Sequence, residues 1–216
     1  SMTPLYEGDP RQILDGIPGL MNNVKMMHTI ARYYSTSERM TTLFKKISNQ
    51  MIVNMREYIT APGNLWTQDR EEMLGRLELC NKVKVRYFEE YMATKDRLEQ
   101  NPKGRQFDFD EDQIFAKINL FGKRVSKLLD MFTTIQQFTT LNEKNSIDGL
   151  VGPIKAFFKV VEEFKRKPYD LMDFAKNQFD RDYLEFNVSV HELETNLQDF
   201  VNASFREITS TEQALN

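Results

Sequence analysis

The chain has 216 residues, of which 40% are hydrophobic and 28% charged, a composition that supports a folded core and excludes wholesale disorder. Its formal net charge of -3 excludes the overall positive charge on which non-specific nucleic-acid binding depends. With 9 glycines and 7 prolines, turn-forming residues are scarce, which favours a few long helices over many short strands. The composition therefore predicts an all-α protein.

The N-terminal part of the chain predicts two helical segments. The first covers 10–16, with Asp9 as its N-cap. The second opens at Pro18 and is broken at 35–37, and it is expected to bury one stripe of side chains. That stripe comprises Leu20, Val24, Met27, Ile30 and Tyr34.

Apolar residues then recur at steps of three and four, a period that alternating strands cannot produce. They predict one amphipathic helix over 40–59, ended at 61–64, and a longer helix over 68–101. Cys80 falls on the apolar stripe of the longer helix, where we expect a small buried side chain. As the single cysteine, it excludes an internal disulfide framework.

Two later stretches carry a strict heptad pattern of large apolar residues, and each must face another helix. The acidic residues 108–112 precede the first stretch and are expected to offset the helix dipole. A loop at 145–149 and a shorter helix over 150–164 separate the two. The first seam comprises Ile114, Ile118, Phe121, Val125, Leu128, Phe132 and Ile135. The second comprises Phe179, Tyr183, Phe186, Val190, Leu193, Leu197 and Phe200.

The predicted architecture is an elongated bundle of long antiparallel amphipathic helices. We expect one domain over 1–216, with a soft division near 102–107, and an expression scar at residues 1–2. Ser210 resembles the start of a further helix, which predicts that the chain is cut from a longer protein. Apolar runs fall short of the roughly 20 residues of a membrane span, so no membrane contact is expected.

The sequence offers little for catalysis or metal binding. The two histidines, His28 and His191, lie far apart, and each is expected on a polar or boundary face of a helix. Two histidines and one cysteine cannot assemble a zinc site of the Cys and His type. Gly122 lacks the flanking residues of a phosphate-binding loop, and the acidic cluster 108–112 suits helix capping better than calcium binding. No catalytic residue, cofactor or metal is predicted.

Two basic stretches are candidate binding surfaces, one at 82–86 and one at 165–169. Glutamates within a helical turn of each favour a solvated helix face over nucleic acid or an anionic membrane. The second stretch is the more accessible candidate for contacting a protein partner. Its proposed partner-binding residues are Lys165, Arg166, Lys167 and Tyr169.

Short motifs along the chain carry a family resemblance. They occupy 107–110, 128–135, 157–158, 163–171, 179–186, 191–194, 204–205 and 208–215, with weaker matches at 5–10, 17–19 and 39–44. In these motifs the chain resembles the N-terminal tail of dynein heavy chains, most closely those of axonemal outer arms. The match is dense over the last half of the chain and less distinctive over 61–106.

The resemblance implies a catalytically silent piece of a motor stem, because in that family the ATP-hydrolysing ring and the microtubule-binding stalk lie far C-terminal to this region. It also implies a location in the cytoplasm and in the cytoskeleton of the ciliary axoneme. The implied partners are other heavy chains, intermediate and light chains, and the docking apparatus on the doublet microtubule, without nucleic acid or a small-molecule substrate. The alternative is a generic helical-rod adaptor or a tethering-complex subunit without motor function.

Overall fold

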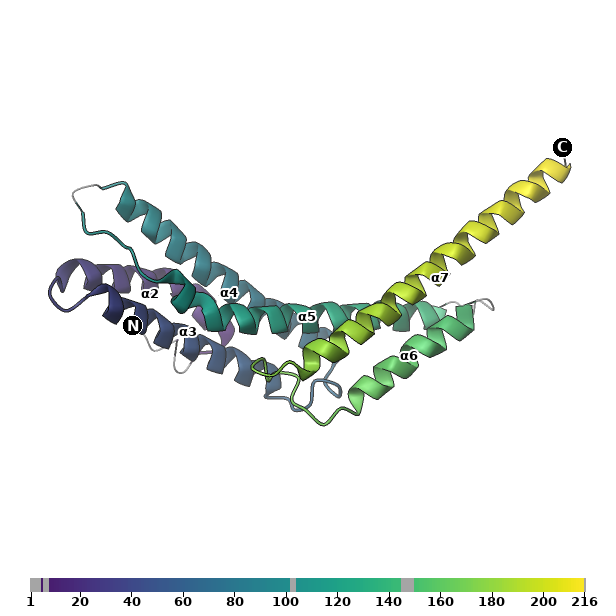
Figure 1. Cartoon of the computed structure of the whole chain (residues 1–216), viewed down its shortest axis with the longest axis horizontal. Coiled ribbons are helices and arrows are strands. Elements are labelled where there is room, and N and C mark those ends of the chain that lie inside the picture. The colour runs from purple at the N-terminus through teal and green to yellow at the C-terminus, as the bar shows by residue number, and fades with distance from the viewer. Residues whose placement is uncertain (1–4, 6–7, 102–103, 145–149, 216) are drawn as a thin grey trace. The chain divides into compact units, whose positions relative to one another are not determined.

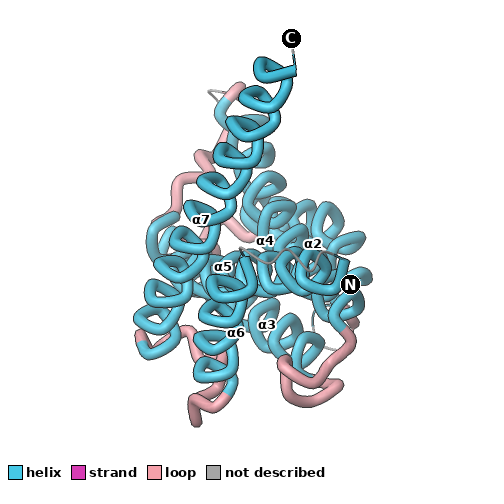
Figure 2. The backbone as a smooth tube through the Cα atoms, turned by 90° about the vertical axis from the view of Figure 1, so that its right-hand side faces the viewer, coloured by secondary structure: helices cyan, strands magenta, loops and turns pink. Residues whose placement is uncertain are grey.

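The computed structural model of the chain describes Leu5 and residues 8–101, 104–144 and 150–215, leaving out the side chains of 143–144 and 207–215 (Figure 1). Across these ranges the chain forms helices joined by loops, without a strand, which confirms the all-α prediction (Figure 2). The predicted loop at 145–149 and the expected scar at 1–2 lie outside the described residues. The helices are α2 (Pro10–Ile30), α3 (Ser37–Thr60), α4 (Arg70–Glu99), α5 (Glu111–Lys144), α6 (Val151–Lys165) and α7 (Gln178–Leu215).

The chain divides into two compact units, Ser1–Leu129 and Asp130–Asn216, and the division falls within α5. The soft division expected near 102–107 lies inside the first unit. The single-domain organisation over 1–216 stays a prediction. Within the described residues, no helix combines the length and apolar character that a membrane crossing needs.

In the first unit, α3 and α4 pack in antiparallel directions. The Met55 carbonyl lies 3.8 Å from the Cys80 thiol, while further along the pair the rings of Phe44 and Tyr91 meet at 5.1 Å between centroids. Cys80 is buried as predicted, and burial raises the pKa of its thiol to about 12. The helix predicted over 40–59 is confirmed, and Gly63, with a φ of 108°, follows its end.

The connection from α4 to α5 crosses the first unit as a strap over residues 104–110. Phe107 and Phe109 on this strap are buried, with centroids 4.6 Å apart. The Phe107 ring also lies 5.8 Å from that of Phe44 and 5.4 Å from that of Tyr91. Aromatic pairs at such distances add about 0.5–1.5 kcal/mol per pair beyond area burial. The strap is thus part of the core.

The predicted helix break at 16–18 is wrong, because α2 is continuous with Pro18 in its interior. Proline in a helix costs about 3 kcal/mol by removing one N–H and crowding the preceding turn. Ile17, Leu20 and Met21 are all buried around it. Each such side chain contributes about 1.5–3 kcal/mol on burial, so the packed face outweighs the defect.

The stripe expected after Pro18 is confirmed at Leu20 and Val24, which are buried, and is wrong beyond them. Met27 is 42% exposed, Ile30 75% and Tyr34 74%, while His28 is 2% exposed instead of lying on a polar face. The strap explains this placement. The His28 ring packs edge-on against Phe107 and Phe109, and its Nε2 lies 3.0 Å from the Gln106 carbonyl oxygen.

Burial of His28 predicts a pH dependence of stability. Burial first, and then the Arg105 charge, lower the pKa of this imidazole from 6.5, against an opposing effect of the Gln106 carbonyl. As pH falls below 6.5 the unfolded chain takes up a proton that the folded chain resists, so this contribution is present above 6.5 and is lost toward acid. We expect urea denaturation to show a smaller loss of stability between about pH 7.5 and about pH 5.5 in His28→Gln than in the parent chain. A His191→Gln control, altered at an exposed position, should keep the parent's loss.

In the second unit, α6 and α7 pack in antiparallel directions through aromatic rings. Phe164 meets Phe179 at 5.8 Å between centroids, and Phe157 meets Phe186 at 5.7 Å. Phe157 also contacts Phe138 of α5 at 5.0 Å. All these phenylalanines are buried, and Phe179 and Phe186 belong to the predicted second seam.

The heptad seams differ in how fully they are buried. Every residue of the first seam is buried, from Ile114 to Ile135. In the second seam Phe179, Phe186 and Leu193 are buried, whereas Tyr183, Val190, Leu197 and Phe200 are half-buried. Because α6 has 15 residues and α7 has 38, α6 can cover only part of α7. The further helix predicted at Ser210 is wrong, since α7 continues through that position to Leu215.

Candidate partner-binding segment between α6 and α7

The residues proposed for partner binding lie in the segment that joins α6 to α7. Helix α6 ends at Lys165, and Arg166 is its C-cap. The segment is anchored beyond this point by Leu171 and Met172, which are both buried. The Met172 amide donates to the Asp170 carboxylate at 2.8 Å. The segment therefore has a fixed backbone on which its charged side chains are displayed.

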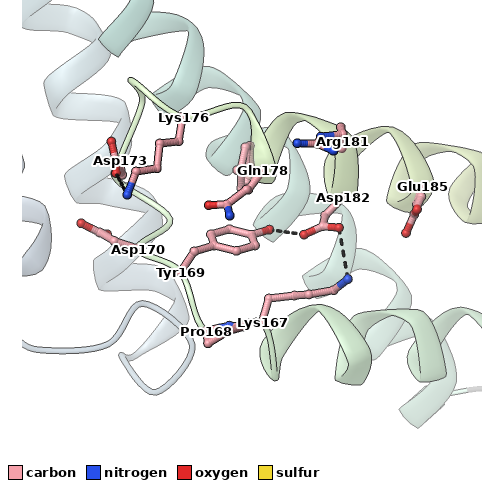
Figure 3. A pocket seen from close by; sticks show the side chains of 11 residues that line it. Lys167, Pro168, Tyr169, Asp170, Asp173, Lys176, Gln178, Arg181, Asp182 and Glu185 are labelled. Atoms are coloured by element: carbon pink, nitrogen blue, oxygen red, sulfur yellow. Dashed lines mark hydrogen bonds and ion pairs between the residues drawn. The ribbon is translucent and has the colours of Figure 1, made fainter.

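Asp182, in the first turns of α7, binds two of the proposed residues through its carboxylate. The Tyr169 hydroxyl donates to its Oδ2 at 2.5 Å, and the Lys167 ammonium lies 3.2 Å from its Oδ1 (Figure 3). The Asp182 side chain is 14% exposed and that of Lys167 41% exposed. We call these two interactions the Asp182 contacts; they tie the segment to α7.

The other two proposed residues, Lys165 and Arg166, do not contact Asp182 in the described structure. The Lys165 ammonium pairs with Glu162 on its own helix at 2.5 Å, a helical pair three residues apart. Arg166 is exposed. Sequence reasoning missed Asp182, because its partners lie 13 and 15 residues earlier and no local spacing links them. Only the antiparallel packing of α6 on α7 brings them together.

A hollow of about 700 Å³ opens beside the Asp182 contacts (Figure 3). Its charged lining mixes cations with carboxylates, including an ion pair of 3.2 Å between Lys176 and Asp173. Neither histidine nor cysteine lines it. The described part of the chain also holds no group of three or more His, Cys, Asp or Glu that could bind a metal. The charged lining residues are Lys167, Lys176, Arg181, Asp170, Asp173, Asp182 and Glu185.

Such a surface can make polar contacts and ion pairs with another molecule. Comparison with known proteins identifies the family of the chain. Residues 1–216 match the family described as dynein heavy chain, N-terminal region 1. The chain belongs to this family. It is 47% identical over 215 residues to the dynein gamma chain of the flagellar outer arm of Chlamydomonas reinhardtii, covering 100% of this chain and 5% of that relative.

Animal dyneins are also similar. Identity is 40% to dynein axonemal heavy chain 5 of Rattus norvegicus, covering 98% of this chain and 6% of that one. It is 35% to human dynein axonemal heavy chain 8, covering 98% and 5%. The chain thus spans about a twentieth of these relatives. The predicted resemblance to dynein is confirmed, and the expected axonemal location agrees with names that are flagellar or axonemal.

The Asp182 contacts of this dynein chain predict a local loss of stability in Asp182→Asn. The substitution removes the ion pair with Lys167 and weakens the bond from the Tyr169 hydroxyl. We expect it to lower the free energy of unfolding by about 1–2 kcal/mol, measured by urea denaturation. Glu185→Gln, at an exposed position of the same helix beside the same hollow, should change it by less than about 0.5 kcal/mol. Equal effects of the two substitutions would contradict this role of Asp182.

Proposed function

We propose that this chain is a non-catalytic structural and assembly module in the heavy-chain tail of an axonemal dynein. The observation that carries the proposal is the match of all 216 residues to the N-terminal region of dynein heavy chains. In the complete heavy chain, the motor that acts on microtubules and drives ciliary movement is formed by other regions. This segment supports the association of heavy chains with one another, with intermediate and light chains, and with the docking apparatus.

The helices suit a load-bearing role. Helix α5 has 34 residues and α7 has 38. At 1.5 Å per residue each extends roughly 50 Å or more. Seam residues such as Phe121 and Leu128 of α5 are 1% and 0% exposed, so bending this helix away from its neighbours would expose apolar surface. Family membership favours the dynein tail over a generic rod adaptor.

This proposal retains four candidate residues for contact with another subunit: Lys165, Arg166, Lys167 and Tyr169. Lys167 and Tyr169 both bond to Asp182 within the chain. Their main role is therefore to hold the conformation of the segment between α6 and α7. Exposed Arg166 is the side chain of the four best placed to reach another subunit. Arg166→Glu should therefore weaken subunit retention in the purified complex without changing the stability of this chain.

Incorporation of the parent heavy chain into axonemes tests the assembly role. A heavy chain carrying Leu128→Asp, a charge at a position that is 0% exposed, should fail to reach isolated axonemes. One carrying Leu120→Asp, at a position of α5 that is 53% exposed, should be incorporated. Electron microscopy of the assembled complex should find α2 to α7 in the tail. Normal incorporation of Leu128→Asp, or density for this segment inside the motor ring, would overturn the proposal.

A further inference from the structure

The C-terminal end of α2 and the turn after it display a concentration of large apolar side chains. Single exposed apolar residues are ordinary, but a run of this density marks an interaction surface. Methionine and tyrosine are also enriched at protein interfaces. We name these residues the α2 end patch: Met26 at 48% exposed, Met27 at 42%, Ile30 at 75%, Tyr33 at 91% and Tyr34 at 74%. The turn lies where the purple helix passes into α3 in Figure 1.

The backbone beneath the patch is held from the strap. The Arg105 guanidinium donates to the His28 carbonyl at 2.7 Å and to the Ser35 hydroxyl at 2.5 Å, and also to the Ser35 carbonyl. The Ser35 hydroxyl in turn donates to the Ala31 carbonyl at 2.8 Å. Arg39 donates to the Tyr34 carbonyl at 3.2 Å. A surface fixed in this way loses little conformational entropy when a partner binds, which favours affinity.

The charges around the patch are mostly positive. Lys25, Arg32, Arg39 and Arg105 of the strap outnumber the carboxylates of Glu38 and Asp108, and the Asp108 carbonyl accepts a hydrogen bond from Ser37 at 3.1 Å, although the chain as a whole carries a net charge of -3. Burial lowers the pKa of the neighbouring His28 imidazole, which disfavours its charged form. An acidic partner would therefore be attracted to this end of the first unit and repelled by the chain's average charge elsewhere.

The partner chemistry that fits is an amphipathic helix with apolar residues on one face and carboxylates at its margins. An anionic membrane is a weaker fit, because lipid-binding segments typically cluster about 4–8 cations. Here the cations are interspersed with the carboxylates of Glu38 and Asp108. We propose that the α2 end patch docks an acidic amphipathic helix of another polypeptide in the dynein complex. This inference rests on the proposed assembly role and names one surface of the chain through which that assembly would occur.

Photocrosslinking in the intact complex tests the inference. Tyr33 is replaced by the photoreactive residue benzoylphenylalanine in the parent heavy chain, and mass spectrometry identifies the peptide joined to it. We expect a peptide from another polypeptide that carries net negative charge and an apolar face at helical spacing. The same residue placed at Lys46, which is exposed on α3, should not capture that peptide.

Two sets of substitutions then separate a specific surface from chance contact. In heavy chains that carry benzoylphenylalanine at Tyr33, Ile30→Ser or Arg32→Glu should reduce the yield of the crosslinked peptide by about tenfold, a loss expected from removing one central contact. Leu184→Ser and Val188→Ser, at positions of α7 that are 65% and 59% exposed, should leave the yield unchanged.

The outcomes that overturn the inference are distinct. They are an absence of product, a product with lipid, a product with a second copy of this segment, or a product with a basic peptide. Each of these in a heavy chain that still enters the axoneme rejects the docking surface alone. Normal entry of the Leu128→Asp heavy chain would instead reject the proposed function.

Discussion

Leu128→Asp is expected to unfold the first unit of the chain. Leu128 is 0% exposed within the α5 seam. Truncating a buried leucine costs about 2–5 kcal/mol, and an unpaired buried carboxylate costs several kcal/mol more. That sum is comparable to the whole stability of a typical domain, about 5–15 kcal/mol. Circular dichroism and thermal melting should show loss of helix and of the cooperative transition.

Leu120→Asp is the matched control, because it introduces the same charge on the same helix at a position that is 53% exposed. Its stability should stay within about 0.5 kcal/mol of the parent. Phe132→Asp applies the same test to the second unit, where Phe132 is 0% exposed. If Leu128→Asp melted like Leu120→Asp, the heptad pattern would not mark the buried face of α5.

The heptad seams could be predicted from the sequence because burial follows helical spacing whenever a helix has a partner along its length. Every first-seam residue is buried for that reason. In the second seam only Phe179, Phe186 and Leu193 are buried, and α6 has 15 residues with which to cover the 38 of α7. Periodicity alone does not encode the length of the partner helix.

The end of α2 escaped prediction because long-range contacts override local pattern there. The stripe that included Met27 and Ile30 continued the helical period, yet the strap occupies the neighbouring face and buries His28 instead. The residues near His28 in the sequence do not predict its contact with Gln106, which lies 78 residues later. The same limit applies to Asp182, the intramolecular partner of Lys167 and Tyr169. Basic residues were visible in the sequence, but their intramolecular partner was not.

The strap yields the second large prediction, a strong destabilisation by Phe107→Ala. Phe107 is 1% exposed, and its ring meets those of His28, Phe44 and Phe109 at 5.6, 5.8 and 4.6 Å. Truncating such a residue costs about 3–5 kcal/mol, to be measured by urea denaturation. Phe88→Ala is the control, since Phe88 is 45% exposed and should cost less than about 1.5 kcal/mol.

Hydrogen exchange can tell where Phe107→Ala acts. Because Phe107 and Arg105 lie on the same strap, loss of the ring should raise exchange first at the strap and at the end of α2, where Arg105 holds His28 and Ser35. The α2 end patch would then lose its fixed backbone, so capture of the acidic peptide through position 33 should fall even where the chain remains folded. Unchanged exchange at 28–35 would mean that the patch holds its shape without the strap, and that Arg105 is not what positions it.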